Sequence, residues 1–252
     1  MRSDNKRLEY EGKKYLSNSC GYFTIAQYIN ASKILVRFEE TGYEKWSTIA
    51  NIKTGMIRDP MLPSVFGVGI FGDMYPAKEN GKMVKHYTVW YGILQMAYDE
   101  KQKISNPSNI GVTVSEEFQH YTKFYEWCDK QIGFGVEGWV IDKDLLLKGN
   151  KEYSNEKCVF LPLEINSALT TTKAKRGDYP IGITKRYSTY NVHVTKHNKL
   201  IWLGAFKTID EAFHKYKTEK EKHLKELAEY YKDQLDPRAY KALLEYKVEI
   251  TD

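Results

Sequence analysis

The sequence contains few cysteines and no close cysteine pair. Its 252 residues include three cysteines, at positions 20, 128 and 158. Because this number is odd and no two cysteines are two residues apart, we expect neither a disulfide framework nor a cysteine-based zinc site. Reduced thiols are typical of cytoplasmic proteins, so a cytoplasmic location is expected.

Long apolar segments are also missing. No apolar run approaches the roughly 18 residues that a membrane-spanning helix needs, so no membrane partner is expected. The first ten residues are polar and charged, which does not suit a secretory signal.

A strong charge of one sign is absent as well. The chain has 38 Lys and Arg against 33 Asp and Glu, which gives a formal net charge of +5. This balance is compatible with nucleic acid as a partner, but many equally basic proteins bind none. A hydrophobic content of 42% and a charged content of 28% are typical of globular proteins.

Residues 1–80 predict a small β-rich unit. Residues 22–25 and 33–38 have the composition of strands, and Asn30 begins a turn between them. Residues 66–72 carry closely spaced glycines, which would suit either a phosphate-binding loop or a glycine-punctuated strand. We favour the strand because no Lys or Ser follows as it does in a P-loop.

Residues 81–170 begin with two helical stripes of aromatic residues, one from Tyr87 to Tyr98 and one from Phe118 to Cys128. Such stripes most simply form a core. Residues 139–141 then predict a strand, residues 158–161 predict a second strand, and Pro162 suits the start of a helix.

This strand–loop–strand–helix order resembles the plan of a ββα-metal (HNH) nuclease site, and that resemblance assigns a divalent cation to two side chains. Asp142 follows the first strand, and Asn166 lies on the helix. Oxygen ligands of this kind suit Mg²⁺ or Mn²⁺, and such a cation neutralises the charge that develops in phosphodiester cleavage. Alternatively, Asp142 and Asp144 only cap loops, and Asn166 is a surface residue of the helix.

Residues 180–216 predict a three-stranded sheet followed by a helix. Thr208 and Glu211 have the spacing of a capping box at the start of that helix. Residues 170–177 are polar and basic and suit a linker, residues 219–234 suit a further helical run, and Pro237 suits the start of a last short helix.

Strand alternation divides the side chains of the predicted sheet between two faces. The apolar residues expected to face the helix are Ile183, Val192, Val194, Ile201 and Leu203. The residues expected on the opposite face are Thr184, Arg186, Asn191, His193, Thr195, Leu200 and Trp202.

Two segments resemble known families. Residues 202–216, with the sequence WLGAFKTIDEAFHKY, resemble the AP2-type DNA-binding domain. An upstream segment resembles phage-type HNH (ββα-metal) endonucleases of the homing kind, which often carry an AP2-type domain. The stretches that carry this second resemblance are Trp90–Tyr98, Ile141–Asp144, Gly149–Asn150, Tyr153, Lys157–Phe160 and Asn166.

The HNH resemblance implies a role for four residues of the upstream segment. Asp142 and Asn166 match the metal ligands, and Lys143 and Asp144 fall at the catalytic positions. Lys143 stands where an active HNH enzyme has its general-base His, and Lys157 stands where the family has an Asn that braces the loop. These departures leave two alternatives open: a metal-dependent nicking endonuclease with a degenerate site, or an inactive relative.

The AP2 resemblance implies duplex DNA as the partner. The residues expected to contact it are Thr184, Lys185, Arg186, His193, Thr195, Trp202, Lys175 and Arg176. Arg186 suits guanine O6 and N7, and the surrounding lysines suit phosphates. The alternatives are a non-enzymatic DNA-binding regulator, a phage factor aimed at a host protein, and a protein-interaction module. A phage-encoded chain would act in the cytoplasm of its bacterial host.

The expected fold class is therefore α+β, in four segments. These are a β-rich unit (1–80), an HNH-like helical and ββα unit (81–170), an AP2-like sheet with its helix (171–235) and a helical tail (236–252).

Overall fold

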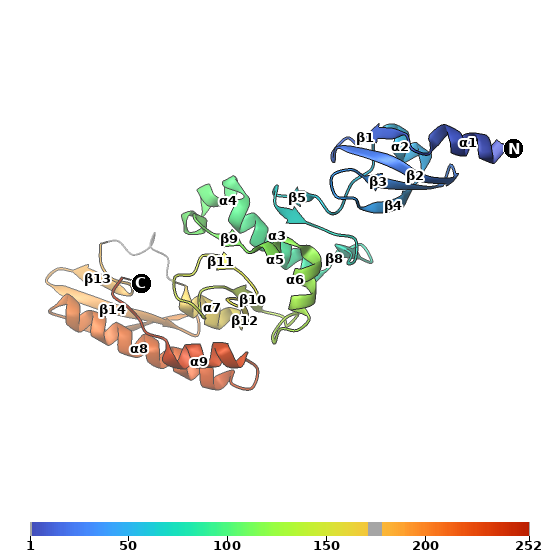
Figure 1. Ribbon diagram of the computed structural model, residues 1–252. Helices are drawn as coiled ribbons and strands as arrows, with labels where there is room; N and C mark the ends of the chain where they lie inside the picture. The colour runs from blue at the N-terminus through green and yellow to red at the C-terminus, as the bar shows by residue number, and fades with distance from the viewer. Residues whose placement is uncertain (1, 171–177, 252) are drawn as a thin grey trace.

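The computed structural model describes residues 2–170 and 178–251, with side chains from residue 6 onward. Helices and small sheets alternate along this part of the chain, which confirms the expected α+β class. Three separate clusters of buried apolar residues follow one another along an elongated molecule (Figure 1). No helix in the described ranges has both the length and the apolar character to cross a membrane.

The first cluster lies against a four-stranded antiparallel sheet in the order β1-β2-β3-β4. Alternate residues of β2 and β3, such as Phe23, Ile25, Ile34 and Val36, are buried, because alternate side chains of a strand share one face. The two strands expected here are confirmed. The elements are α1 (Arg2–Tyr10), β1 (Lys14–Leu16), β2 (Tyr22–Asn30), β3 (Lys33–Phe38), β4 (Glu44–Ser47) and α2 (Ile49–Thr54).

Two short hairpins follow, formed by β5 (Pro63–Val65) with β6 (Gly69–Ile70) and by β7 (Lys78–Glu79) with β8 (Lys82–Met83). Gly69 belongs to a strand, as the favoured interpretation of residues 66–72 predicts. A Cβ atom at Gly69 would lie 2.6 Å from Cδ1 of Leu94, so the glycine allows the strand to approach the next helix closely.

The central cluster contains both aromatic stripes. Trp90 and Leu94 of the first stripe and Phe118, Tyr121 and Phe124 of the second are fully buried, which confirms their assignment to the core. The elements are α3 (Lys85–Tyr98), α4 (Glu100–Ser105), the 3-10 turn η1 (Pro107–Asn109), β9 (Thr113–Val114), α5 (Glu116–Gln119), α6 (Tyr121–Cys128), β10 (Trp139–Asp142), β11 (Glu152–Tyr153), β12 (Val159–Pro162) and α7 (Leu163–Leu169).

The third cluster lies between an antiparallel sheet, β13-β14-β15, and the first half of α8. The three strands and the capping box of Thr208 and Glu211 are as expected. However, α8 continues without a break, where the sequence suggested a helix followed by a separate helical run. The elements are β13 (Ile183–Arg186), β14 (Thr189–Lys196), β15 (Lys199–Phe206), α8 (Ile209–Tyr230) and α9 (Pro237–Glu245).

The long helix α8 contributes to two cores. Ala212 and Tyr216, in its first half, pack under the sheet. Leu224 and Leu227, in its second half, belong to the central cluster together with Leu243 of α9. The helix α8 therefore joins the sheet to the elements that pack on the central cluster, which we call the central unit.

Candidate nucleic-acid interface and metal site

The strand–loop–strand–helix order expected for residues 139–170 is present. β10 and β12 pair antiparallel, with Trp139 opposite Pro162 and Asp142 opposite Val159. α7 begins directly after β12 because Pro162 takes a non-helical conformation before it. Asp142 therefore ends the first strand, and Asn166 lies in the helix that follows the second.

The Asp142 carboxylate has one oxygen in use and one without a partner. Oδ2 accepts hydrogen bonds from the backbone N–H groups of Asp144, at 2.9 Å, and Leu145, at 2.8 Å. Oδ1 accepts none from the described residues. Burial raises the pKa of the Asp142 carboxyl, and the nearby Asp144 carboxylate raises it further. Asp142 thus caps the loop, as the alternative to metal binding predicts. Its second oxygen is left for another ligand.

Lys143 is tied into the loop. Its ammonium pairs with the Asp144 carboxylate and donates to the backbone oxygen of Asn150 at 3.3 Å. It also lies 5.8 Å from the centre of the Tyr153 ring. These contacts tie the Lys143 amine to the loop and to the Asp144 carboxylate.

Asn150 braces the loop, a role that the sequence did not reveal. Its amide nitrogen donates to the backbone oxygens of Lys143, at 2.8 Å, and Glu152, at 2.7 Å. Its side-chain oxygen accepts from the Glu152 N–H at 3.2 Å. Lys157, expected near the bracing position, instead pairs with the Glu152 carboxylate at 2.5 Å. Gly149–Asn150 is one of the stretches that carry the HNH resemblance, but that resemblance does not assign the bracing role to Asn150.

Asn166 lies half-buried on α7, and its side chain forms no hydrogen bond with the described residues. In the described ranges, no three His, Cys, Asp or Glu side chains converge on one point. The charged groups around His120 are Lys123 and Glu116, so this histidine does not replace the missing base near Asp142. No hydrogen bond among the described residues joins Asp142 to Asn166, so their pairing as metal ligands stays a prediction.

The outer face of the three-stranded sheet is the second candidate site. We use this name for the side of the sheet opposite α8. The register places Thr184 opposite Asn191, His193 opposite Trp202, and Thr195 opposite Leu200. The outer face, with Arg186 at its end, contains the residues that alternation predicted.

This face is open and partly apolar. Trp202 is 62% exposed and Leu200 is 71% exposed, although side chains of this kind are usually buried. Tyr187 is 88% exposed in the turn after β13, and the Arg186 guanidinium lies 5.7 Å from the centre of its ring. Exposed aromatic rings beside cationic groups are suited to sugars, bases and phosphates.

Four other residues of this region, for which the sequence predicted a side of the sheet or a contact with DNA, do not lie on the outer face as described. Lys185 lies opposite Tyr190, so the register puts it on the side of α8, and its ammonium is 5.7 Å from the Tyr190 ring centre. Ile201 faces the same side but is 40% exposed, because α8 runs mainly under β14 and leaves this edge strand partly uncovered. The predicted contacts Lys175 and Arg176 lie outside the described residues.

The turn between β14 and β15 contacts α7. His197 and Asn198 both have positive φ, of 49° and 60°, as a two-residue type I′ turn requires. His197 Nδ1 lies 2.7 Å from a Glu164 carboxylate oxygen, and the Tyr231 hydroxyl donates to the other oxygen at 3.2 Å. Glu164 therefore fixes the tip of the sheet and α8 against the helix that carries Asn166.

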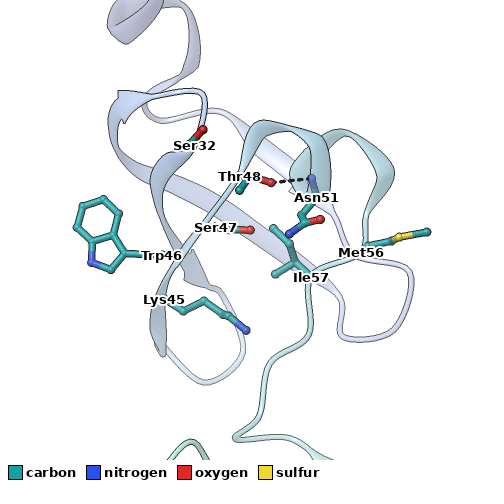
Figure 2. A pocket seen from close by; sticks show the side chains of 8 residues that line it. All are labelled: Ser32, Lys45, Trp46, Ser47, Thr48, Asn51, Met56 and Ile57. Carbon is teal, nitrogen blue, oxygen red and sulfur yellow. Dashed lines mark hydrogen bonds between the residues drawn. The ribbon is translucent and has the colours of Figure 1, made fainter.

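A pocket in the N-terminal unit has no comparable chemistry. It encloses about 310 Å³ beside β4 and α2. Figure 2 shows the indole of Trp46 pointing away from Thr48 and Asn51, whose own hydrogen bond caps α2. Because the Thr48 hydroxyl accepts from the Asn51 backbone N–H in the helix cap and the aromatic ring points elsewhere, the pocket brings no reactive groups together.

Comparisons of the chain with protein-family models, with curated proteins and with solved structures find no match in any of the three. The likeness to HNH and AP2 proteins therefore rests on the residue patterns given above. The function has to be argued from the two sites themselves.

Proposed function

We propose that this chain binds duplex DNA through the outer face of the β13-β14-β15 sheet. The observation that carries the proposal is the exposure of Arg186, Trp202 and Leu200 on the two edge strands of a sheet whose other face packs on α8. A sheet with one buried face has a regular outer face, and a narrow β-ribbon or sheet is able to enter the major groove.

The residues on this face divide into two kinds of contact. Arg186 would donate to guanine O6 and N7, or to a phosphate, through its planar guanidinium. Trp202 and Leu200 would pack against sugars and thymine methyl groups. Thr184 and Thr195 would donate hydrogen bonds to phosphates, which position the protein without reading sequence. The resemblance to AP2-type domains supports the same orientation.

Binding of labelled duplexes, followed by fluorescence anisotropy over a salt series, tests this proposal. The wild-type affinity should fall as salt rises, because bound phosphates release counterions. Arg186→Ala should weaken binding by about 1–3 kcal/mol. Arg37→Ala is the matched control, since Arg37 is an exposed strand arginine of the N-terminal sheet that pairs with Glu44. Equal affinities for wild type and Arg186→Ala would contradict the proposal.

A second candidate function is metal-dependent nicking of the bound DNA. The observation that favours it is the half-buried Asp142 carboxylate, which has an oxygen without a partner at the end of β10. Carboxylate and amide oxygens are ligands that Mg²⁺ accepts, so Asp142 and Asn166 fit such an ion. The bound cation would neutralise charge on the scissile phosphate.

In that reaction the chain's own residues would bind the cation, brace the loop and bind phosphate. Asp142 and Asn166 would hold the cation, and Asn150 would keep the loop in place. Lys143 and Asp144, at the catalytic positions, form an ion pair, and Lys143 would act as a phosphate-binding cation. With no base at this position, cleavage would be slow or absent, and the chain would act as a DNA-binding regulator.

Incubation with supercoiled plasmid, with Mg²⁺, with Mn²⁺ or with EDTA, separates the two outcomes. A nuclease would nick the plasmid with either cation, and Asp142→Ala would abolish the nicking. Asp73→Ala is a control at an acidic residue outside the site, where the carboxylate accepts from the Tyr43 hydroxyl at 2.6 Å. No nicking by the wild type, with DNA binding intact, would exclude the second candidate and leave the first.

A further inference from the structure

Lys220 is a buried lysine that has no partner among the described residues. It lies in the middle of α8 and is only 9% exposed. Its ammonium forms no hydrogen bond or ion pair with any described residue. The acids on either side of it in the sequence are engaged by other lysines, since Glu219 pairs with Lys215 at 3.1 Å and Glu221 pairs with Lys217 at 3.3 Å. Lysines buried to this degree are normally paired.

No carboxylate of the described residues compensates the charge of Lys220. Burial lowers its pKa to about 8, and no carboxylate offsets that effect. His223, on the next turn, is 1% exposed and its Nδ1 has no hydrogen-bond partner, since the nearest carboxylate, Glu226, is 3.8 Å away. Burial, together with the charges of His197, Lys220 and Lys196, lowers the pKa of His223. An anion entering this region would meet the uncompensated charge of Lys220, because the nearby Glu164 carboxylate is already paired with His197.

Lys220 lines a pocket of about 330 Å³ at the junction of α7 and the sheet. We call this the Lys220 pocket. Its other polar lining residues include Ser167 and Thr170 from the end of α7 and Thr184, His193 and Thr195 from the sheet. Hydroxyl, imidazole and ammonium groups are hydrogen-bond donors, and a phosphate oxygen accepts from all of them. The volume is ample for a phosphate group with several waters.

We propose that the Lys220 pocket binds a phosphate group, with Lys220 as its cationic ligand. Thr184, His193 and Thr195 belong to both this pocket and the outer face, so the geometry favours a backbone phosphate of bound DNA as the source. That choice of source rests on the proposed function, whereas the phosphate site itself does not. A bound phosphate would also supply the negative charge that Lys220 and His223 lack.

Two measurements on the full chain test this inference, with Lys220→Met as the variant and Lys222→Met as the control. Lys222 lies on the same helix, and its side chain is 66% exposed. In the first measurement, the NMR signal of the Lys220 side chain is followed over a pH titration. The titration is carried out once in inorganic phosphate and once in chloride at equal ionic strength. Phosphate, and not chloride, should raise the pKa of Lys220.

The second measurement is the salt dependence of duplex binding. Lys220→Met should weaken binding roughly tenfold at low salt for all sequences alike. It should also reduce the slope of log affinity against log salt by about one. Lys222→Met should change neither quantity. Thermal unfolding is the control for folding, and Lys220→Met should be at least as stable as wild type because it removes an uncompensated buried cation.

The outcomes separate the two proposals. No response of Lys220 to phosphate, together with an unchanged salt slope in Lys220→Met, overturns the phosphate site even if DNA binds. A response to phosphate with an unchanged slope supports the site and overturns DNA as its source. If the wild type binds no duplex at any salt concentration, the proposed function fails, and the phosphate titration alone decides the inference.

Discussion

At the scale of single residues, the loop after β10 is organised by charge and by one amide. Asp142 gives one oxygen to the loop, and Lys143 pairs with Asp144. Asn150 ties the two sides of the loop together through backbone groups. The loop is therefore stable without a bound ion, and a cation would add to this arrangement without having to create it.

The raised pKa of Asp142 has a consequence for stability. Because the folded-state pKa lies above the unfolded value, the stabilising contribution of this group is complete below the unfolded pKa and is lost as pH rises through the folded pKa. Asp142→Asn keeps an oxygen that accepts the two backbone hydrogen bonds and removes the charge. We expect it to exceed wild type by about 1 kcal/mol at neutral pH.

Urea unfolding at several pH values checks this prediction. The advantage of Asp142→Asn should vanish towards about pH 3, where the wild-type carboxyl is protonated in both states. Asp144→Asn is the control and should bring no gain, since it breaks the ion pair with Lys143. An Asp142→Asn variant that is less stable than wild type at neutral pH would contradict the burial argument.

The sequence predicted the positions of these residues better than their contacts. Asp142 lies at the end of a strand and Asn166 lies on a helix because apolar runs and Pro162 mark those elements plainly. The bracing role of Asn150 depends on backbone groups that only the folded loop brings together. The burial of Lys220 could likewise not be predicted from the sequence, because the neighbouring residues of its helix are mostly charged.

At the scale of elements, the loop between β10 and β12 allows a direct test of which contacts stabilise it. Leu145, Tyr153 and Cys158 anchor it in the central cluster, and the hydrogen bonds of Asn150 hold the chain between the first two of these anchors. Strand and helix boundaries follow from periodicity, but a loop of this length has no periodic pattern to predict its path.

Asn150→Ala should cost about 2–3 kcal/mol of unfolding free energy, because it removes three hydrogen bonds and leaves backbone groups without partners. The measurement is the urea midpoint of the central unit. Lys157→Ala is the control within the same loop. Its ion pair with Glu152 is about one-third exposed on each side, so its loss should cost less than 1 kcal/mol. Equal effects of the two variants would show that Asn150 does not brace the loop.

At the scale of the whole molecule, α8 couples the sheet to the central unit, and the N-terminal unit has its own core. Tyr216 and Leu227 lie on one continuous helix but belong to different clusters. Ile34 lies in a cluster that α8 does not reach. The sequence suggested separate helical runs after the sheet, because its mixed charge masks the apolar positions that keep one helix packed on two cores.

Unfolding should therefore occur in two stages, one for the N-terminal unit and one for the sheet together with the central unit. Leu227→Ala should cost about 2–5 kcal/mol and lower the stability of the sheet and the central unit together. Ile34→Ala should lower only that of the N-terminal unit. Hydrogen exchange followed by mass spectrometry, in increasing urea, resolves the units. Loss of protection in all three units at once, in either variant, would contradict this arrangement.

Binding of duplex DNA by the outer face is the central claim, and hydroxyl-radical footprinting of the protein tests it most directly. Trp202 and Tyr187 are exposed and oxidise readily when free, as do Trp46 and Met56 of the N-terminal unit. With saturating duplex, oxidation of Trp202 and Tyr187 should fall several-fold, while Trp46 and Met56 keep their rates. Unchanged oxidation of Trp202 in the presence of bound DNA would contradict the account.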